Sequence, residues 1–490
     1  MQKFSAANCA NAASFKANNS VVTRSIKFVV EACGGELVAG AGDTVYNRVC
    51  TDSRQVRTGD LFFAIKGEHF DGHDFVSEAA RRGAVGAVVN RQFHQGSLRN
   101  RCALVVVDDT RVALGRLASK YRAEHDVLAV AVCGSNGKTT VKELIAAVLR
   151  QQFNTHWSQA SYNNDIGVPL TLLGLTAAHK VLVAEAGTNH PGELAPLLRM
   201  IRPRYGVLTN IGREHMEFFA DLAGVAQEEG WLGELLPADG LFVIDGDGEW
   251  SDYLARRTRA RVVRVGLSDR NNWRATDIQL DERGVTFNVV APEPAYCGQY
   301  RVNLLGRHQA LNALFAIVVG EELGLGRAVI QRGLAECKPP PMRLQLSERR
   351  GIWILDDSYN ANAESMAVAL RTLAELPCAG RRVAVLGDMA EQGDYTAAVH
   401  AEVGRLAAEL GIGQLFAVGK MASVTAQAAR AAGLTRVMEF AEVETAACAI
   451  RKFLKPGDLV LLKASRAARF ERLAEALCIA ESKNVECCFI

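Results

Sequence analysis

Apolar runs separated by segments with helical spacing recur along the chain and predict an α/β protein. Val127–Cys133 is an unbroken apolar run, rich in β-branched residues and of the right length for one strand that is buried on both faces. The apolar positions after it recur at helical spacing instead, namely Val141, Leu144, Ile145, Val148 and Leu149. The residues in between, Gly134–Thr140, therefore form a tight turn from a strand into a helix.

The same alternation continues toward the C-terminus and predicts a largely parallel sheet covered by helices. Strand-like runs recur at Val181–Ala184, Tyr205–Thr209 and Leu241–Ile244, with helical patterns such as Glu193–Met200 between them. From Arg261 to Val290 the segments become short and alternating, which favours a minor antiparallel sheet.

Two further α/β units flank this central one, so we expect three domains. The N-terminal unit has a short helix at Ile26–Cys33 and strands at Ala84–Val89 and Ala103–Val107. The proline-rich stretch Lys338–Pro341 is a stiff linker, and beyond it lie strands at Ile352–Leu355, Val383–Leu386, Leu415–Val418 and Leu459–Leu462. The predicted domains are residues 23–126, 127–338 and 339–490, after a polar extension at 1–22 that we expect to be disordered.

Composition describes an ordinary globular protein. Of 490 residues, 49% are hydrophobic and 22% charged, and the formal net charge of +2 favours neither nucleic acid nor an anionic membrane as a partner. No apolar stretch approaches the length of a transmembrane helix. The twelve cysteines show no metal-binding spacing, and several lie in apolar runs (Cys102, Cys133, Cys448), so we interpret them as core residues in a reducing compartment. We therefore expect a cytoplasmic protein without membrane insertion.

The glycine-containing turn Gly134–Thr140, which reads GSNGKTT, predicts a polyphosphate site. Glycines let backbone N–H groups approach an anion, and the start of a helix adds unpaired donors and its dipole. Lys138 would neutralise the β- and γ-phosphates of ATP, and Thr139 would offer its hydroxyl to Mg²⁺. The general pattern has a further glycine where this chain has Val132, so only the shorter GxxGKT form is present. A glycine turn without a ligand is the alternative.

Polar residues also follow other predicted strands, at the edge where parallel sheets bind ligands. Glu185 ends one strand, and His215 lies shortly after another. Lys463 ends a strand of the C-terminal unit.

Together these stretches resemble the Mur ligases, the ATP-dependent amide-forming enzymes of peptidoglycan precursor synthesis. The resemblance covers residues 25–480, and its marks are GSNGKTT at 134–140, SYNNDIGVPLTLL at 161–173, EAGTNHPGEL at 185–194, TNIGREHMEFF at 209–219, GRHQALNA at 306–313, DDSYNAN at 356–362, LGDMAEQG at 386–393 and KASR at 463–466. Folylpolyglutamate synthases share the loop motif, but YNNDIGVPLTLL together with DDSYNAN is narrower. It points to the family member that joins D-alanyl-D-alanine to UDP-MurNAc-tripeptide.

The resemblance implies a fold, a reaction and a set of site residues. A small N-terminal α/β domain holds the UDP-sugar, a central P-loop domain holds ATP and Mg²⁺, and a C-terminal Rossmann-like domain carries D-Ala-D-Ala. ATP phosphorylates the tripeptide carboxylate, and the dipeptide amine attacks the acyl phosphate. The implied nucleotide contacts are Gly134, Ser135, Asn136, Gly137, Lys138, Thr139, Thr140, Asn312, Arg343 and Asp357; the Mg²⁺ ligands are Thr139, Glu185 and His215; the substrate contacts are Ser53, Arg54, Asn163, Asn164, Asn360, Asn362, Lys463, Ser465 and Arg466. A monomer is expected.

Two residues depart from the family pattern. Gln309 stands where members usually have Asn, and Glu229 stands where they have a lysine that CO₂ carbamylates. We hypothesise that Glu229 supplies directly the negative charge of the modified lysine near the second Mg²⁺, which makes it a candidate catalytic residue beside Lys138, His215 and Arg343. A solvated helical glutamate is the alternative.

Two other functions compete with this interpretation. The first is the neighbouring diaminopimelate- or lysine-adding ligase, which would be expected to carry an Asn-Pro-Arg motif that this chain lacks. The second is a regulatory protein that binds ATP without turnover, which Glu229 and Gln309 would suit. The sequence leaves open whether the tripeptide carries diaminopimelate or lysine.

Overall fold

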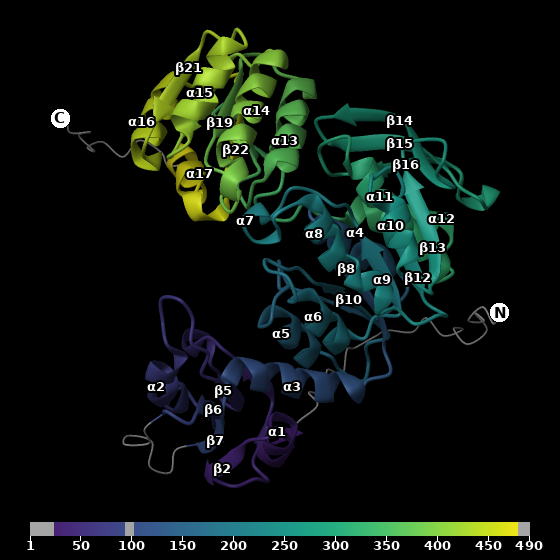
Figure 1. Cartoon of the computed structure of the whole chain (residues 1–490), viewed down its shortest axis with the longest axis vertical. Coiled ribbons are helices and arrows are strands. Elements are labelled where there is room, and N and C mark those ends of the chain that lie inside the picture. Colours follow the sequence, from purple (N-terminus) through teal and green to yellow (C-terminus); the bar gives the residue numbers. More distant parts are fainter. Residues whose placement is uncertain (1–23, 94–101, 479–490) are drawn as a thin grey trace.

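The computed structural model describes residues 24–93 and 102–478, and the expected extension at 1–22 lies outside them. These residues form a five-stranded, a nine-stranded and a six-stranded sheet and a two-stranded ribbon, β1 (Arg24–Ser25) with β3 (Val45–Tyr46). Helices cover the sheets, and the N-terminal and C-terminal units lie toward opposite ends of the long axis with the nine-stranded sheet between them (Figure 1). The α/β class and the three-part architecture are confirmed, while the residue boundaries of the domains remain predictions.

The N-terminal unit is a mostly parallel sheet in the order β2-β7-β6-β5-β4. Its strands are β2 (Glu36–Ala39), β4 (Arg48–Cys50), β5 (Asp60–Phe63), β6 (Gly86–Asn90) and β7 (Ala103–Val107), and its helices are α1 (Ile26–Cys33) and α2 (Val76–Arg81). α1 ends at Gly34, whose left-handed φ of 67° allows the chain to turn into β2. The long helix α3 (Thr110–Ala123), capped by the Asp109 side chain, leads to the central unit.

The central sheet has the order β16-β15-β14-β13-β12-β11-β8-β10-β9. Its strands are β8 (Leu128–Cys133), β9 (Thr155–Trp157), β10 (Val181–Glu185), β11 (Tyr205–Leu208), β12 (Leu241–Asp245), β13 (Arg261–Gly266), β14 (Trp273–Asp281), β15 (Gly284–Val290) and β16 (Gly298–Val302). All neighbours from β9 to β14 pair in parallel, and β14, β15 and β16 pair antiparallel.

The expectation of a minor antiparallel sheet over Arg261–Val290 is therefore wrong in two respects. β13 is parallel to β12, and the antiparallel strands that follow extend the same central sheet. The physical reason is burial: Val265 and Trp273 pack into the core cluster of β8, so these strands cannot form a surface of their own.

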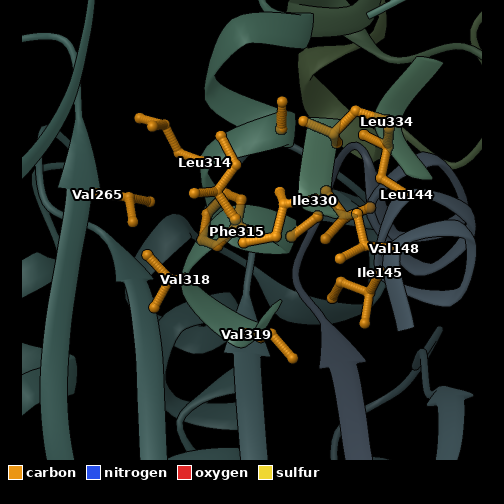
Figure 2. Close-up of a cluster of buried hydrophobic side chains, with 14 of the residues drawn as sticks. Leu144, Ile145, Val148, Val265, Leu314, Phe315, Val318, Val319, Ile330 and Leu334 are labelled. Atoms are coloured by element: carbon orange, nitrogen blue, oxygen red, sulfur yellow. The ribbon is translucent and has the colours of Figure 1, made fainter. Parts of the chain in front are cut away.

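Two hydrophobic layers sandwich the central sheet. Val130 and Val132 of β8 face one cluster, and Ala129, Ala131 and Cys133 face the other, as the period of two in a strand requires. The first layer is built by α4 (Lys138–Leu149), α11 (Gln309–Glu322) and α12 (Arg327–Glu336), and Figure 2 shows Phe315 of α11 close to Ile330 of α12, with Val148 of α4 near them. The second layer includes α5 (Gly167–Leu173), α6 (Leu194–Ile201), α9 (Trp231–Glu234) and α10 (Ser251–Arg256). The buried double-sided packing fixes β8 and therefore the turn that follows it.

The C-terminal unit is a six-stranded sheet in the order β17-β18-β22-β19-β20-β21, parallel except at β17. Its strands are β17 (Gln345–Arg349), β18 (Ile352–Asp356), β19 (Arg382–Leu386), β20 (Gln414–Val418), β21 (Val437–Phe440) and β22 (Leu459–Lys463), and its helices are α13 (Ala363–Glu375), α14 (Thr396–Glu409), α15 (Ala422–Ala431), α16 (Val443–Phe453) and α17 (Glu471–Cys478). Two short helices of the central unit, α7 (Met216–Phe219) and α8 (Leu222–Glu229), lie where this unit meets the central one (Figure 1).

Two sequence expectations concern burial. Cys133 is buried as expected and Cys102 is partly buried, but Cys448 lies on the exposed side of α16, so its assignment to the core is wrong. No helix within the described ranges is long and apolar enough to cross a membrane.

Candidate active site

The predicted loop joins β8 to α4, and close contacts and hydrogen bonds fix its backbone. Gly134 has a φ of +112°, and a Cβ there would lie 2.4 Å from Thr209 Oγ1, so only glycine fits. Asn210 holds the next residues: its carbonyl accepts from the N–H of Ser135 (2.9 Å), and its Oδ1 accepts from the N–H of Asn136 (3.0 Å). The Ser135 hydroxyl, in turn, accepts from the N–H of Gly212 at 2.8 Å.

These contacts decide which backbone N–H groups of the loop can still donate to a ligand. The N–H groups of Gly134, Ser135 and Asn136 already have protein acceptors. Gly137, with a φ of +84°, caps α4, and the N–H groups of the first helical turn lack intrahelical partners by geometry. The donors available to an anion are therefore those at the start of α4, which include Thr139 and Thr140.

Lys138 is surrounded by acceptors. Its Nζ donates to the carbonyls of Gly134 (2.5 Å) and Ser135 (3.2 Å) and to Oε2 of Glu214 (3.2 Å). Burial alone would lower the pKa of Lys138, but the carboxylates around it, Glu214 first and then Glu229 and Glu185, outweigh burial and raise that pKa. The ammonium is therefore a permanent positive charge at the start of α4.

Thr139 and Glu185, two of the predicted Mg²⁺ ligands, lie together. The Thr139 hydroxyl donates to Oε1 of Glu185 at 3.2 Å, and the Asn163 side chain donates to the same oxygen at 2.9 Å. Oε2 of Glu185 is buried without a hydrogen-bond partner, although the ammonium of Lys142 lies 3.8 Å away. A buried carboxylate oxygen with spare capacity next to a hydroxyl is a donor set that suits a divalent cation.

His215, the third predicted ligand, contacts the C-terminal unit instead. It has a left-handed φ of 51°, and its Nδ1 lies 2.5 Å from Oε2 of Glu391. The His215 imidazole, bonded to the Glu391 carboxylate, lowers the pKa of that carboxyl group. Across residues 24–93 and 102–478, no three His, Cys, Asp or Glu side chains gather closely enough to hold a metal by themselves. Any cation at Thr139 and Glu185 would need phosphate oxygens and water as further ligands, as Mg²⁺ commonly does.

Glu229 is wholly buried at the end of α8, so the alternative of a solvated glutamate is wrong. Its Oε2 accepts from the N–H of Gly134 at 2.8 Å, and its Oε1 is buried without a hydrogen-bond partner. Burial raises the pKa of Glu229 to about 8, against the opposing charge of Lys138. The structure thus brings Glu229 to the loop rather than to the surface.

Two predicted nucleotide contacts come from outside the loop. Nη2 of Arg343 donates to the hydroxyls of Thr139 (3.0 Å) and Ser161 (3.3 Å), and its guanidinium lies over the Tyr359 ring. Asn312 of α11 lies beside Gly137, since a Cβ at that glycine would be 3.1 Å from Asn312 Oδ1.

Gln309, the first departure from the family pattern, is buried and orients Asn312. Its Oε1 accepts from the Asn312 side chain at 2.9 Å, and its Nε2 lies 2.9 Å from Nε2 of His308. Burial, with the Lys463 charge, lowers the pKa of His308 to about 4, so the neutral ring accepts this hydrogen bond. Gln309 therefore directs Oδ1 of Asn312, rather than its amide nitrogen, toward the loop.

The C-terminal residues divide into two groups. Lys463 was expected to face substrate, but it is buried: its Nζ donates to Asp357 Oδ2 (2.6 Å) and to the carbonyl of Asn360 (3.1 Å). Ser465 accepts from the N–H of Ala390 at 2.8 Å. These residues hold together the loops at the strand ends.

Asn362 forms a direct bridge to the central unit. It caps α13 and donates from Nδ2 to Oδ1 of Asn136 in the P-loop at 3.0 Å. Arg466, in contrast, is exposed and lies 3.4 Å from Glu471. The C-terminal unit therefore already touches the nucleotide loop.

Three further predicted substrate contacts make hydrogen bonds or pack within their own segments. Ser53 is buried, and Arg54 forms a fork to Asp52, which lowers the pKa of that carboxyl group to about 2. Oδ1 of Asn164 accepts from the N–H of Gly167, the first residue of α5, at 2.9 Å. A hollow of about 430 Å³ opens nearby, lined by Thr51, Ile65, Gly67, Glu68, His69, Phe70 and Ile166. It lies between the N-terminal unit and Ile166, the residue that precedes α5.

Sequence reasoning missed two residues that the fold brings to the site, whereas Asn210, which fixes the loop, was expected at the edge of the sheet because it follows a predicted strand. Lys142 is fully buried and binds the carbonyls of Ser158 (2.8 Å) and Ala160 (2.5 Å), and Glu214 contacts Lys138. Glu214 stands between Arg213 and His215, which looks like a charged surface stretch. Only its burial distinguishes it, and burial is a tertiary property.

Comparison with known protein families agrees with this geometry. The model of the Mur ligase middle domain matches residues 132–320, that of the Mur ligase glutamate ligase domain matches 342–466, and that of the Mur ligase family catalytic domain matches 45–122. The chain belongs to the Mur ligase family. It is an ATP-dependent ligase, as the resemblance in its motifs implied.

Relatives with this architecture match over nearly the whole chain. The UDP-N-acetylmuramoyl-tripeptide–D-alanyl-D-alanine ligase of Escherichia coli K12 is 37% identical over 93% of this chain and 99% of its own length. The enzyme of the same name from Bacillus subtilis 168 is 32% identical, with 93% and 99% covered. Among solved structures, MurF from Acinetobacter baumannii superposes with a TM-score of 0.83 at 28% identity, covering 94% of this chain and 99% of that one. MurF ligase from Thermotoga maritima, solved in complex with ADP, gives 0.76 at 27% identity, covering 88% and 96%.

Proposed function

We propose that this Mur ligase joins D-alanyl-D-alanine to UDP-N-acetylmuramoyl-tripeptide, with conversion of ATP to ADP and phosphate. The substrates are those that the names of its full-length relatives specify. The observation that carries the proposal is the convergence of Lys138, Thr139 and Glu185 with Arg343 and Asn362 across two domains at one loop. A protein that only bound nucleotide would not need this arrangement of cations and carboxylates around it.

The chemistry explains why these groups meet. The tripeptide carboxylate and the γ-phosphate of ATP are both anions, so they approach each other only if positive charge surrounds them. Lys138 supplies fixed positive charge at the loop, and Arg343 supplies it at the Thr139 hydroxyl. Thr139 and Glu185 are the residues that would hold Mg²⁺, which when bound neutralises phosphate charge and polarises the phosphoryl oxygens.

The resulting acyl phosphate must be kept from water until the amine attacks. In the proposed reaction the amine of D-Ala-D-Ala forms the new amide bond, and phosphate leaves with the electron pair of the broken C–O bond. Asn362 and the His215–Glu391 pair draw the C-terminal unit onto the loop, which excludes water from the reacting atoms. Lys463 and Ser465 act in this proposal by shaping the C-terminal strand ends, and Arg466 is the exposed cation available to a substrate carboxylate.

The UDP-sugar end would occupy the hollow beside the N-terminal unit. Thr51, Gly67 and His69 line it, and Ser53 and Arg54 follow closely in the chain. Asn163 and Asn164 connect this region to Glu185 and to α5. We further propose that the enzyme works in the cytoplasm as a monomer.

Glu229 takes the place of the modified lysine in this proposal. Because burial raises the pKa of Glu229 to about 8, the group must lose its proton before its buried, unpartnered Oε1 supplies negative charge beside Lys138 without CO₂, and a cation at the site would favour that loss. Turnover should therefore be indifferent to depletion of bicarbonate, and the matched measurement is the rate before and after bicarbonate is removed and restored. A severalfold stimulation by bicarbonate would contradict this role for Glu229.

The test of the main proposal is phosphate release from MgATP by purified protein with defined substrate pairs. We expect release only when UDP-MurNAc-tripeptide and D-Ala-D-Ala are present together. Release that instead needs UDP-MurNAc-dipeptide and diaminopimelate would make the chain the neighbouring ligase. ATP binding without turnover with either pair would make it a regulatory protein. Tripeptides with diaminopimelate or with lysine, compared at equal concentration, identify the third residue.

A further inference from the structure

Glu214 is a buried carboxylate in direct contact with the P-loop lysine. The residue is 8% exposed, and its Oε2 lies 3.2 Å from Nζ of Lys138. Its Oε1 is buried without a hydrogen-bond partner. The contact is therefore a pair of opposite charges inside the protein, which is far less screened than a surface ion pair.

The contact with Glu214 occupies the third and last N–H donor of the Lys138 ammonium. A lysine ammonium has three N–H donors, and here they meet the carbonyl of Gly134, the carbonyl of Ser135 and Oε2 of Glu214. A phosphate oxygen that binds Lys138 must take the place of one of these acceptors. Of the three, Glu214 is the only anion, so it competes with phosphate for the same charge.

The backbone around Glu214 is fixed from both sides. Arg213 binds Glu364 of α13 (Nε–Oε1, 2.6 Å) and both carboxylate oxygens of Glu402 of α14 (2.9 and 3.1 Å). His215 binds Glu391. Because both neighbours are tied to the C-terminal unit, the lysine side chain has more freedom to move away than the glutamate has.

A move of Lys138 toward phosphate would take the cation away from Glu214 and reduce the positive charge near two other carboxyl groups. Glu229 and Glu185 both raise the pKa of Lys138 from nearby, after the larger effect of Glu214. Both also carry a buried oxygen without a hydrogen-bond partner. Additional positive charge must then enter the site together with the nucleotide.

We propose that Glu214 is a positioning residue that holds Lys138 in the nucleotide-free enzyme, competes with nucleotide phosphates for it, and thereby makes nucleotide binding depend on a divalent cation. This inference rests on the nucleotide site of the proposed function. It adds that the chain itself weakens the binding of metal-free nucleotide. The cause is one carboxylate, Glu214, which can be substituted without changing a residue of the loop.

The test compares ADP binding to the full-length wild type, Glu214→Gln and Glu217→Gln by titration calorimetry, once with Mg²⁺ and once with EDTA. Glutamine keeps the shape of the side chain and removes its charge. Glu217 is the matched control because it is an exposed carboxylate only three residues away on α7. Thermal melting of each variant verifies that it is folded.

With EDTA present, we expect Glu214→Gln to bind ADP about tenfold more tightly than the wild type, since a charge-assisted hydrogen bond no longer competes. With Mg²⁺ present, the difference should shrink to about threefold or less. Glu217→Gln should match the wild type in both conditions. Glu214→Ala, which removes the carboxylate completely, should change affinity in the same direction and serves if the glutamine variant does not fold.

Equal metal-free affinity of wild type and Glu214→Gln would overturn the proposal, because Glu214 would then only fill space. Weaker metal-free binding by the variant would overturn it too, because the carboxylate would then help to present Lys138 to phosphate. Failure of the wild type to bind MgADP would instead refute the nucleotide site itself, so the two failures are distinguishable.

Discussion

The prediction that tests the loop geometry most directly is Gly134→Ala. At a φ of +112°, an alanine is strained by about 1–2 kcal/mol. Its Cβ would lie 2.4 Å from Thr209 Oγ1 and 2.9 Å from the backbone oxygen of Asn210, whereas ordinary contacts begin at 3.4 Å. Thr209 cannot rotate away without loss, because its hydroxyl donates to the carbonyl of Asn136 at 2.6 Å. Relief of the clash adds about 1–3 kcal/mol, so the loop is displaced at a total of about 2–5 kcal/mol.

The assay is calorimetric titration of MgADP, with thermal melting to verify folding. We expect Gly134→Ala to lose about thirtyfold or more in MgADP affinity. The matched control is Gly192→Ala in the same unit: Gly192 has a φ of +91°, but a Cβ there would meet nothing within 4 Å. This control has the backbone strain without the clash, and its affinity should stay within about threefold of wild type. MgADP binding by Gly134→Ala at the wild-type level would refute the reasoning.

Three further predictions concern stability and domain docking. Phe315→Ala leaves a cavity in the hydrophobic cluster between α4 and the central sheet. Denaturant titration should show a free energy of unfolding lower by about 3–5 kcal/mol, and a loss under about 1 kcal/mol would contradict this packing. Arg213→Gln leaves its two C-terminal carboxylates without a cation, so small-angle scattering should report a larger radius and turnover should fall about tenfold, whereas an unchanged radius would argue against the clamp. Burial would raise the pKa of the Asp458 carboxyl, but hydrogen bonds from Arg381 prevail and lower it. Since the pKa of Asp458 in the folded protein lies below the unfolded value of about 3.9, its carboxylate stabilises the fold above that pH. The difference in the free energy of unfolding between wild type and Asp458→Asn should therefore shrink as pH falls below about 4. A pH-independent difference would contradict the lowered pKa of Asp458.

The local pattern of the chain determined the elements that carry the loop. The run Val127–Cys133 and the helical spacing after Val141 are short-range signals, and β8 and α4 formed where they predicted. The roles of the motif residues Lys138 and Thr139 could also be predicted from the sequence, because their chemistry depends on a strand, a turn and a helix that are adjacent in sequence. Glu185 at the end of its strand followed from the same rule.

What the sequence could not determine depends on residues far apart in the chain. The pairing of β13 with β12 is decided by which strands share a core, so a local pattern of short strands misassigned it. Glu214 has the pattern of a charged position on an exposed segment, and a solvated glutamate was the alternative to the metal-site role of Glu229, yet both lie buried, 76 and 95 residues away from their partners at the loop.

The resemblance implied that Arg343 and Asp357 of the C-terminal unit contact the nucleotide, but the direct contact of Asn362 with Asn136, 226 residues away, was not predicted. Burial and charge pairing are set by the whole fold, and a buried carboxylate is tolerated only where distant donors or cations meet it. For this reason the sequence alone identified the loop and its chemistry, while only the tertiary structure decided which carboxylates surround its lysine.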